Sequence, residues 1–563
     1  MSPQTEVLIK LALTLAGLVV LLWRMRKRPE SSSAGAALGL VAVLAAAAHL
    51  NFFTFHSGHF THFAENFHYQ LGSKYFPEVG YDGLYQASVA AQAESAPSLP
   101  LPREIRDLLT NAFIPVRRVD AHREEVIRRF TPDRWRSFVK DHSEFLDRSY
   151  IHNLNEARHD HGYNPTPTWT FVARLFNAWL PLDATTIPIL ALLDWVILGA
   201  TFVVVFRTYG SGVGATALLL FGVGYPWRYG WVGGGFLRYD WLAAIVIGTC
   251  LLKRRRFGAA GFLFAYSAAV RLFPALILFG VAAVAAWGLI RRTSVSWAVR
   301  FGAGALAGAV VFFLAGAMTG RGFAAWPEFV HNIEKHHDTW STNRAGLEFA
   351  VVTTPKTMLS RIPTSLPLSQ RSAMWQEEMN LAQRARRPLY LGLAILLVAG
   401  AAAAAATSRP DEGAAIGVTA VFAGLVLSCY YWVVLVVLAF RRSTDGAVGI
   451  LAANAAALIA ALFTDDTQII FAVFSWAVLA ALASLVVSDV TMAARSGWAA
   501  PPAGSDDGVA RGGDGSRAPA VGGRPPRHRP KARKHARALL LPEPLVRLLT
   551  PGPARPTGSI SVG

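Results

Sequence analysis

The sequence predicts an all-α polytopic membrane protein, for three reasons. The 563-residue chain is 53% hydrophobic, and its mean hydropathy of +0.34 is too high for a soluble protein of this size. Its apolar residues come in long blocks, which indicates many transmembrane helices and not one buried core. Lys and Arg lie in short clusters between these blocks, as the positive-inside rule predicts for cytoplasmic loops.

The net charge is +18 at pH 7, and such a basic chain first suggests a nucleic-acid partner. The position of the charge argues against that partner, because the basic residues lie between apolar blocks and near the C-terminus. We therefore expect membrane lipids and no nucleic acid as partners. Cys250 and Cys429 lie in or beside apolar blocks, which is typical of small core residues and not of a disulfide or a metal site.

Residues 1–33 are predicted to form an extra N-terminal transmembrane helix and a basic cytoplasmic loop. The apolar run Val7 to Trp23 is followed by the basic run Arg24 to Arg28. A signal peptide would carry its basic residues before the apolar run, so we place the N-terminus outside and the basic run in the cytoplasm. The next apolar run, Ala34 to Leu50, is expected to cross back outward.

Residues 34–490 are predicted to form the main transmembrane module, which gives the chain about 11–13 transmembrane helices in all. Two large extracytoplasmic loops, 51–165 and 320–388, interrupt this module. The spans predicted after the first loop cover 185–206, 215–225, 241–252, two short helices within 257–290, 299–318, 389–406, 414–430, 431–440, 447–463 and 469–487.

Within the first loop we expect helices at 103–110, 122–129 and 134–145, where charges recur at i, i+4 spacing. The short amphipathic run Trp169 to Leu180 is expected to lie at the membrane interface. Residues 491–563 are rich in Gly, Pro, Ala, Arg and Lys, a composition that predicts a disordered basic cytoplasmic tail. We expect this tail to contact anionic lipid; a specific protein or nucleic-acid role is the alternative.

The stretch from His62 to Tyr85 combines ionisable groups with many aromatic rings, which is typical of a membrane interface. Glu65 is its candidate catalytic carboxylate, and Asp82 is the alternative. The candidate substrate-binding residues in the same stretch are His68, Tyr69 and Lys74. Structural roles remain alternatives: a cap or an ion pair for Glu65, a turn for Asp82 and a packing role for His68.

Further polar groups are expected on the same side of the membrane. They are Tyr163 and Asn164 at the end of the first loop, Arg238 and Asp240 in an Arg-Tyr-Asp-Trp run, Arg271 between two short helices, and Trp326 and Asn343 in the second loop. Charged groups near a bilayer are costly, so they tend to be functional or paired. Arg238 with Asp240 also fits a plain ion pair, and Arg271 also fits an interfacial snorkel.

These residue types suit a substrate with an apolar tail and a phosphate head. A carboxylate deprotonates an attacking hydroxyl, and arginine holds a leaving phosphate as a bidentate clamp. No metal ligands are predicted, because His331, His336 and His337 do not form a zinc pattern with a distant third ligand. The sequence also lacks a phosphate-binding P-loop, a dinucleotide glycine pattern and a Gly-x-Ser-x-Gly elbow.

The chain resembles the GT-C superfamily of integral-membrane glycosyltransferases, and within it the bacterial polyprenyl-phosphate-mannose-dependent mannosyltransferases. The resemblance covers most of 34–487. The matching features, in chain order, are an acid after an early span (Glu65), the aromatic run Phe67 to Tyr69, the Gly-Leu-Tyr run Gly83 to Tyr85, the helix entry Tyr163 to Pro167, Arg271 with Pro274, and a late Trp…Asn…Gly-Leu pattern (Trp326, Asn343, Gly346, Leu347).

This resemblance implies a GT-C-like helical bundle that moves a mannose-like hexose from a polyprenyl-phosphate donor to an extracytoplasmic acceptor with inversion. The acceptor class stays open among lipid, glycan and protein. The family acid is usually Asp, so the base stays open among Glu65, Asp82 and Asp240. Asp240 is expected to orient Arg238, which with Arg271 would hold the donor phosphate. Some members use a divalent metal ion, so this cofactor also stays open.

The expected location is a bacterial inner (plasma) membrane, with an extracytoplasmic active site. A transporter or flippase for a lipid-linked or amphipathic solute is the alternative function. Transporters usually carry internal repeats with matched broken helices, and we find no clear repeat in this sequence. Convergence of Glu65, Arg238 and Arg271 on one outward site would favour the enzyme, whereas polar residues along a path across the bilayer would favour the transporter.

Overall fold

The computed structural model describes residues 2–26, 32–56, 58–148, 151–337 and 339–498. It is 75% helix with few strands, so the predicted all-α class is confirmed. The described chain belongs to one compact unit, Met1–Pro501. The predicted tail, 491–563, begins as the end of a helix that runs to Arg495, and its residues from 499 on lie outside the described ones.

Seven helical segments in the described chain are long and apolar enough to cross a membrane, so the chain is a multi-pass membrane protein. They are α1 (Pro3–Arg26), α12 with α13 (Thr186–Ala191, Leu193–Val223), η3 with α17 (Phe273–Ile277, Leu278–Ile290), α18 (Ser296–Gly316), α21 (Leu368–Ala406), α23 (Asp445–Phe463) and α24 (Thr467–Arg495). Shorter helices lie at other predicted spans: α2 (Ser32–His49), α15 (Asp240–Lys253), α16 (Phe257–Val270), α22 (Pro410–Gly424) and η7 (Cys429–Phe440).

Two predicted interruptions of the apolar blocks are present. Within α13 the backbone leaves the helical conformation at Gly210, whose φ of 82° favours glycine, so the segment is two helices joined at a kink. Between α16 and α17, Arg271 adopts an extended conformation just before Pro274. The 257–290 block is therefore two short helices, as the sequence predicts.

Small residues bring several of these helices into close contact, as is common between helices in membranes. A Cβ atom at Gly261 of α16 would lie 2.0 Å from the carbonyl oxygen of Phe301 in α18. A Cβ at Gly304 of α18 would lie 1.9 Å from the carbonyl oxygen of Gly258. The α16–α18 pair therefore packs backbone against backbone. The N-terminal helix α1 is also part of the bundle, since it packs on α2 and α23.

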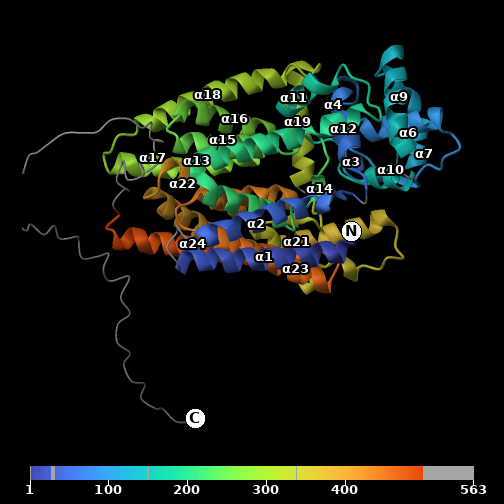
Figure 1. Cartoon of the computed structure of the whole chain (residues 1–563). Coiled ribbons are helices and arrows are strands. Elements are labelled where there is room, and N and C mark those ends of the chain that lie inside the picture. The colour runs from blue at the N-terminus through green and yellow to red at the C-terminus, as the bar shows by residue number, and fades with distance from the viewer. Residues whose placement is uncertain (1, 27–31, 57, 149–150, 338, 499–563) are drawn as a thin grey trace, which may run out of the picture. The chain divides into compact units, whose positions relative to one another are not determined.

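The first loop folds into short elements that gather at one end of the bundle, called the loop end below (Figure 1). They are η1 (Asn51–Phe53), α3 (Phe63–Asn66), the π-helical turn η2 (Phe67–Leu71), α4 (Gly72–Lys74), α5 (Phe76–Val79), α6 (Leu84–Ser95), β1 (Glu104–Arg106), β2 (Phe113–Pro115), α7 (Val116–Ala121), α8 (Arg123–Ile127), α9 (Pro132–Arg148) and α10 (Ile151–Ala157). Helix α11 (Pro167–Asn177) follows them, and α14 (Tyr229–Val232) lies further along the chain.

One predicted helix of this loop is wrong. The segment 103–110 contains strand β1, which pairs antiparallel with β2 so that Glu104 faces Pro115 and Arg106 faces Phe113. The guanidinium of Arg106 lies over the Phe113 ring, 4.3 Å from its centroid. Charge spacing at i, i+4 reports only contacts within a helix, so it could not predict this contact between strands. Helices α8 and α9 confirm the predictions at 122–129 and 134–145.

Helix α21 begins at Leu368, within the predicted second loop, and continues through Pro388 into the span predicted at 389–406. The loop contains η4 (Gly322–Ala324), α19 (Ala325–His337), β3 (Arg344–Ala345), α20 (Leu347–Val352), η5 (Pro355–Thr357) and η6 (Leu359–Arg361). Strand β3 pairs antiparallel with β4 (Leu427–Ser428), which directly precedes η7. The second loop is thereby joined to the start of η7.

Candidate functional site

The site is built around an ion pair between the first loop and the segment that precedes α15. The Nε atom of Arg238 lies 2.6 Å from Oε2 of Glu65. Glu65 is held in the short helix α3, whose first turn is capped because the backbone N–H of Glu65 donates to Nδ1 of His62 at 3.3 Å. Both partners are largely shielded from solvent, so their charges interact in a low-dielectric setting.

Arg238 is fixed through its backbone by an acid that the sequence analysis did not select. The N–H of Arg238 donates to both carboxylate oxygens of Asp194 at 2.9 Å, and the N–H of Tyr239 donates to the same carboxylate at 3.2 Å. Asp194 is the acidic residue in the first turn of α13. A buried acid inside an apolar segment is itself a functional signal, and that signal could have identified this residue.

Aromatic rings position the Arg238 guanidinium. Its carbon lies 4.1 Å from the centroid of the Tyr69 ring and 5.3 Å from that of Tyr430, which are cation–π distances. The indole N–H of Trp241 donates to the carbonyl oxygen of Arg238 at 2.9 Å. Tyr430 comes from η7 and was not among the predicted site residues, because no local pattern marks it.

Arg271 contributes a second buried guanidinium. Its side chain lies over the Trp169 ring, 5.4 Å from the centroid, and Nη1 donates to the carbonyl oxygen of Val270 at 3.0 Å. Arg271 is only 7% exposed. Its Nε and Nη2 atoms, and Nη1 of Arg238, have no hydrogen-bond partner among the described residues. A buried donor without a partner is costly, and these three donors suit an anionic ligand.

The predicted residues Tyr69, Tyr163 and Asn164 come together beside the two arginines. The hydroxyl of Tyr69 donates to Oδ1 of Asn164 at 3.2 Å. The Tyr69 ring packs on Tyr163 and edge-on against Trp169, with centroid separations of 6.2 and 5.5 Å. The end of the first loop therefore supplies a rigid aromatic wall.

The carboxylate of Asp240 forms its hydrogen bonds with residues other than Arg238. Its Oδ2 accepts a hydrogen bond from the Tyr266 hydroxyl at 2.8 Å, and its Oδ1 accepts one from the Trp241 N–H. The acid that accepts hydrogen bonds from the backbone of Arg238 is Asp194. Asp240, which was predicted to orient Arg238, interacts with Arg271 and more weakly with Arg238 through its charge. Asp240 lies at the start of α15, joined to α16 through Tyr266.

His68 lies near Glu65, since each charge acts on the other group. Its Nε2 atom is 2.8 Å from the Tyr85 hydroxyl, and its Nδ1 atom is 4.0 Å from a carboxylate oxygen of Asp160. The ring is buried. Burial lowers the pKa of His68, which keeps the ring neutral and suits a hydrogen-bonded packing residue.

Three other predicted residues lie in separate contacts. Lys74 is buried against Asp141 at 2.5 Å and donates to the carbonyl oxygen of Leu180 at 2.6 Å. Asp82 forms a looser ion pair with Arg129 at 3.4 Å. Trp326 stacks on Phe313 at 5.0 Å, and its indole N–H donates to the carbonyl of the same residue. The side chain of Lys74 is thus occupied by a structural contact.

Asn343 links the second loop to η7. Its side-chain oxygen accepts a hydrogen bond from the hydroxyl of Ser341 at 2.7 Å. Its carbonyl oxygen accepts one from the N–H of Cys429, also at 2.7 Å. Cys429 and Tyr430 directly follow strand β4, which pairs with β3 of the second loop. The second loop is therefore attached next to Tyr430, whose ring contacts Arg238.

Burial has the largest effect on the pKa of Glu65. Removal from water raises the pKa of its carboxyl above the usual range, and the guanidinium of Arg238 opposes that rise. His68, Asp160 and Arg271 act more weakly on the same group. The neighbouring His62 has its pKa lowered to about 4 by burial, so its ring is neutral where it caps α3.

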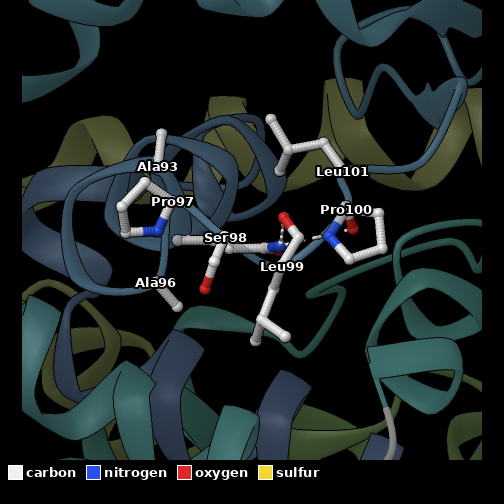
Figure 2. A pocket seen from close by; sticks show the side chains of 8 residues that line it. Ala93, Ala96, Pro97, Ser98, Leu99, Pro100 and Leu101 are labelled. Carbon is white, nitrogen blue, oxygen red and sulfur yellow. Dashed lines mark hydrogen bonds between the residues drawn. The ribbon is translucent and has the colours of Figure 1, made fainter.

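Two cavities lie at other places in the loop-end region. One, of about 330 Å³, is formed around the end of α6 by Gln92, Ala93 and the residues from Ala96 to Leu101 (Figure 2). Its lining has no ionisable side chain, so it offers little for acid–base chemistry. The other, about 280 Å³, lies between the two loops and carries charged and aromatic groups.

No group of three or more His, Cys, Asp or Glu side chains that could hold a metal ion occurs among the described residues. Comparison of the whole chain with protein-family models, with curated proteins and with solved structures finds no match. The chemistry of the site is therefore argued from its own residues.

Proposed function

We propose that this protein is a membrane glycosyltransferase that moves a mannose-like hexose from a polyprenyl-phosphate donor to an extracytoplasmic acceptor. The observation that carries the proposal is Arg271, a buried guanidinium with two hydrogen-bond donors that lack a partner among the described residues. A third such donor belongs to Arg238, the ion-pair partner of Glu65. Phosphate oxygens satisfy such donors, and a polyprenyl chain is soluble in the surrounding bilayer.

The reaction needs a base, and Glu65 is the proposed one. Its carboxylate takes the proton of the acceptor hydroxyl, and the acceptor oxygen then forms a bond to the anomeric carbon of the sugar. The bond from that carbon to the phosphate oxygen breaks, and polyprenyl phosphate leaves with the electron pair. Attack opposite to the leaving group inverts the anomeric configuration. A pKa raised by burial makes Glu65 a stronger base than an exposed carboxylate.

The leaving phosphate carries the charge that develops during bond cleavage. Arg271 and Arg238 would stabilise it with fixed donors in a site shielded from water, where such interactions are strongest. Tyr69, Tyr430 and Trp169 hold the two guanidinium groups in place. Keeping buried donors without a protein partner is costly, and this cost supports an anion-binding role for the two arginines.

The proposed location is a bacterial plasma membrane, with a bundle of about 11–13 spans and the loop end outside the cytoplasm. Nucleotide sugars are made in the cytoplasm, so a lipid-linked sugar is the proposed donor at this end. The acceptor is a lipid, a glycan or a protein. A divalent metal ion is not required by the proposed steps, because the two arginines supply the positive charge.

The class is tested by sugar transfer in membranes that contain or lack the protein. Radiolabelled polyprenyl-phosphate mannose and polyprenyl-phosphate glucose serve as donors, and labelled nucleotide sugars serve as the control. We expect transfer from one lipid-linked donor only when the protein is present. Absence of transfer from both donors, together with protein-dependent movement of the lipid-linked sugar across the bilayer, would instead identify a transporter.

A further inference from the structure

The cavity of about 280 Å³ lies between the two loops. On one side are the β1–β2 pair and the segment after α10, and on the other are the turn after α19 and the first turns of α21. Its volume is close to the lower end of small-molecule pockets, roughly 300 Å³. This size suits one sugar ring. The lining includes Arg106, Glu156, His161, Trp340, Arg371 and Trp375.

Contacts between the two loops hold the cavity together. The side-chain amide of Asn111 donates to the hydroxyl of Thr339 at 2.8 Å. The ammonium group of Lys335 donates to the carbonyl oxygen of Leu108. The rings of His161 and His336 meet edge to face with centroids 5.5 Å apart. The cavity is therefore a preformed feature of the loop end and not a gap between independent segments.

Two indoles in the lining are locked in place. The indole N–H of Trp340 donates to Asn380 at 2.9 Å, and that of Trp375 donates to the carbonyl oxygen of Thr357 at 3.0 Å. The side chain of Gln376 makes two hydrogen bonds to the backbone of Trp340, at 2.7 and 2.9 Å. Rigid aromatic surfaces next to hydroxyl groups are suited to sugars, which present C–H faces and polar edges.

The charge of the lining is positive. Arg106 is held by the carbonyl oxygens of His159 and Asn111, at 2.8 and 2.7 Å. Arg371, on the opposite side, has a buried Nε with no hydrogen-bond partner among the described residues. The acid in the lining, Glu156, has a side chain that is 60% exposed and lies 3.8 Å from His159. A carboxylate on a bound sugar would satisfy this Nε donor of Arg371.

We propose that this cavity binds an acidic hexose, and that this sugar is part of the acceptor. The binding claim rests on the cavity alone, whereas the acceptor role rests on the proposed glycosyltransferase function. The cavity lies next to Asp160, because the lining residue His161 follows it in the chain. A carboxylate oxygen of Asp160 lies 4.0 Å from Nδ1 of His68. The charges of Asp160 and His68 both act on Glu65, so this side of the cavity lies near the first-loop residues that surround the proposed base.

The test is equilibrium dialysis of the purified full-length protein in lipid nanodiscs with radiolabelled glucuronic acid, and with glucose for comparison. We expect the wild type to retain glucuronic acid about tenfold better than glucose, the factor that one charge-assisted hydrogen bond supplies. Arg371→Gln should lose this preference, and Arg371→Lys should keep part of it. The control is Arg384→Gln, at an exposed position of the same helix, which should bind as the wild type does.

Two results would overturn the inference: equal binding of both sugars by the wild type, or an unchanged preference in Arg371→Gln. Its failure is distinguishable from failure of the proposed function. Glu65→Gln should keep the binding of glucuronic acid while sugar transfer is lost. Binding without any transfer from lipid-linked donors would refute the proposed function and leave the sugar site in place.

Discussion

The guanidinium of Arg238 lies between Glu65, 2.6 Å from its Nε, and the face of the Tyr69 ring, 4.1 Å from the guanidinium carbon. Residues far apart in the sequence thus form one buried unit, whose Arg238 backbone is anchored by Asp194. A buried ion pair by itself is weak evidence for function, because such pairs also occur as structural contacts. The argument for a ligand site therefore rests on two buried guanidinium groups, Arg238 and Arg271, whose donors without a partner among the described residues remain available to an anion.

Replacing Arg238 by Gln should move the acid limb of the kcat/KM profile to higher pH. The Arg238 charge lowers the pKa of Glu65 against the effect of burial, so its removal raises that pKa further. A general base works only when deprotonated, so activity is lost as the pH falls through the raised pKa. Arg238→Lys keeps the charge and should keep the limb near its wild-type position. Coincident profiles for all three proteins would show that Arg238 does not act on the base.

Replacing Arg271 by Gln should weaken use of the lipid-linked donor by about 10- to 100-fold in kcat/KM, the loss expected when a charge-assisted contact to phosphate is removed. The measurement is initial transfer rate against donor concentration in detergent or nanodiscs. Arg361→Gln, at an exposed position of the second loop, is the matched control and should behave as the wild type does. Equal effects of the two substitutions would remove Arg271 from the donor site.

Lys74 is a predicted substrate-binding residue, and its buried contact with Asp141 indicates a structural role instead. Asp141→Asn should destabilise the fold by about 3–5 kcal/mol, because it leaves the buried ammonium without its counter-charge. The folded fraction should retain the wild-type KM for the donor. Asp133→Asn, in the exposed first turn of the same helix, should leave thermal unfolding unchanged. A raised KM with unchanged stability would restore the binding role.

The α16–α18 contact gives a test of the fold that is independent of catalysis. Gly261→Leu should abolish the folded protein, because its side chain would occupy the space of the Phe301 backbone. Gly302→Leu lies on the same helix pair but has no atom within 4 Å of its added Cβ, so it should be tolerated. Size-exclusion profiles in detergent compare the two variants. Equal yields of monodisperse protein would contradict the close helix packing.

Hydrophobic blocks predict the helical class and most helix positions, because the composition of a membrane segment alone distinguishes it from a soluble one. The break at Arg271 and Pro274 is predictable in the same local way, since a proline removes a backbone hydrogen bond and a charge inside an apolar run disfavours a continuous span. Strand β1 was missed because its partner β2 fixes it, and no local pattern shows such pairing.

The candidate site was predicted only in part. Glu65, Arg238, Tyr69 and Asn164 lie in stretches rich in polar and aromatic residues, so their types and order suggested a common location. Asp194 could have been selected as an acid inside an apolar segment, but its partner, the Arg238 backbone, depends on tertiary structure. Tyr430 contributes through a cation–π contact with Arg238, which no local pattern marks. Lys74 looks equally suitable in sequence, and only its contact with Asp141 from α9 separates it from the site.

The central claim is that Glu65 is the base of a sugar transfer from a polyprenyl-phosphate donor. The most direct measurement is the rate of that transfer by purified wild type, Glu65→Gln and Asp82→Asn at matched amounts of folded protein. We predict a loss of at least about 100-fold in Glu65→Gln, the lower end of the contribution of a general base, and a near-normal rate in Asp82→Asn, whose carboxylate pairs with Arg129. A normal rate in Glu65→Gln with a lost rate in Asp82→Asn would contradict the account.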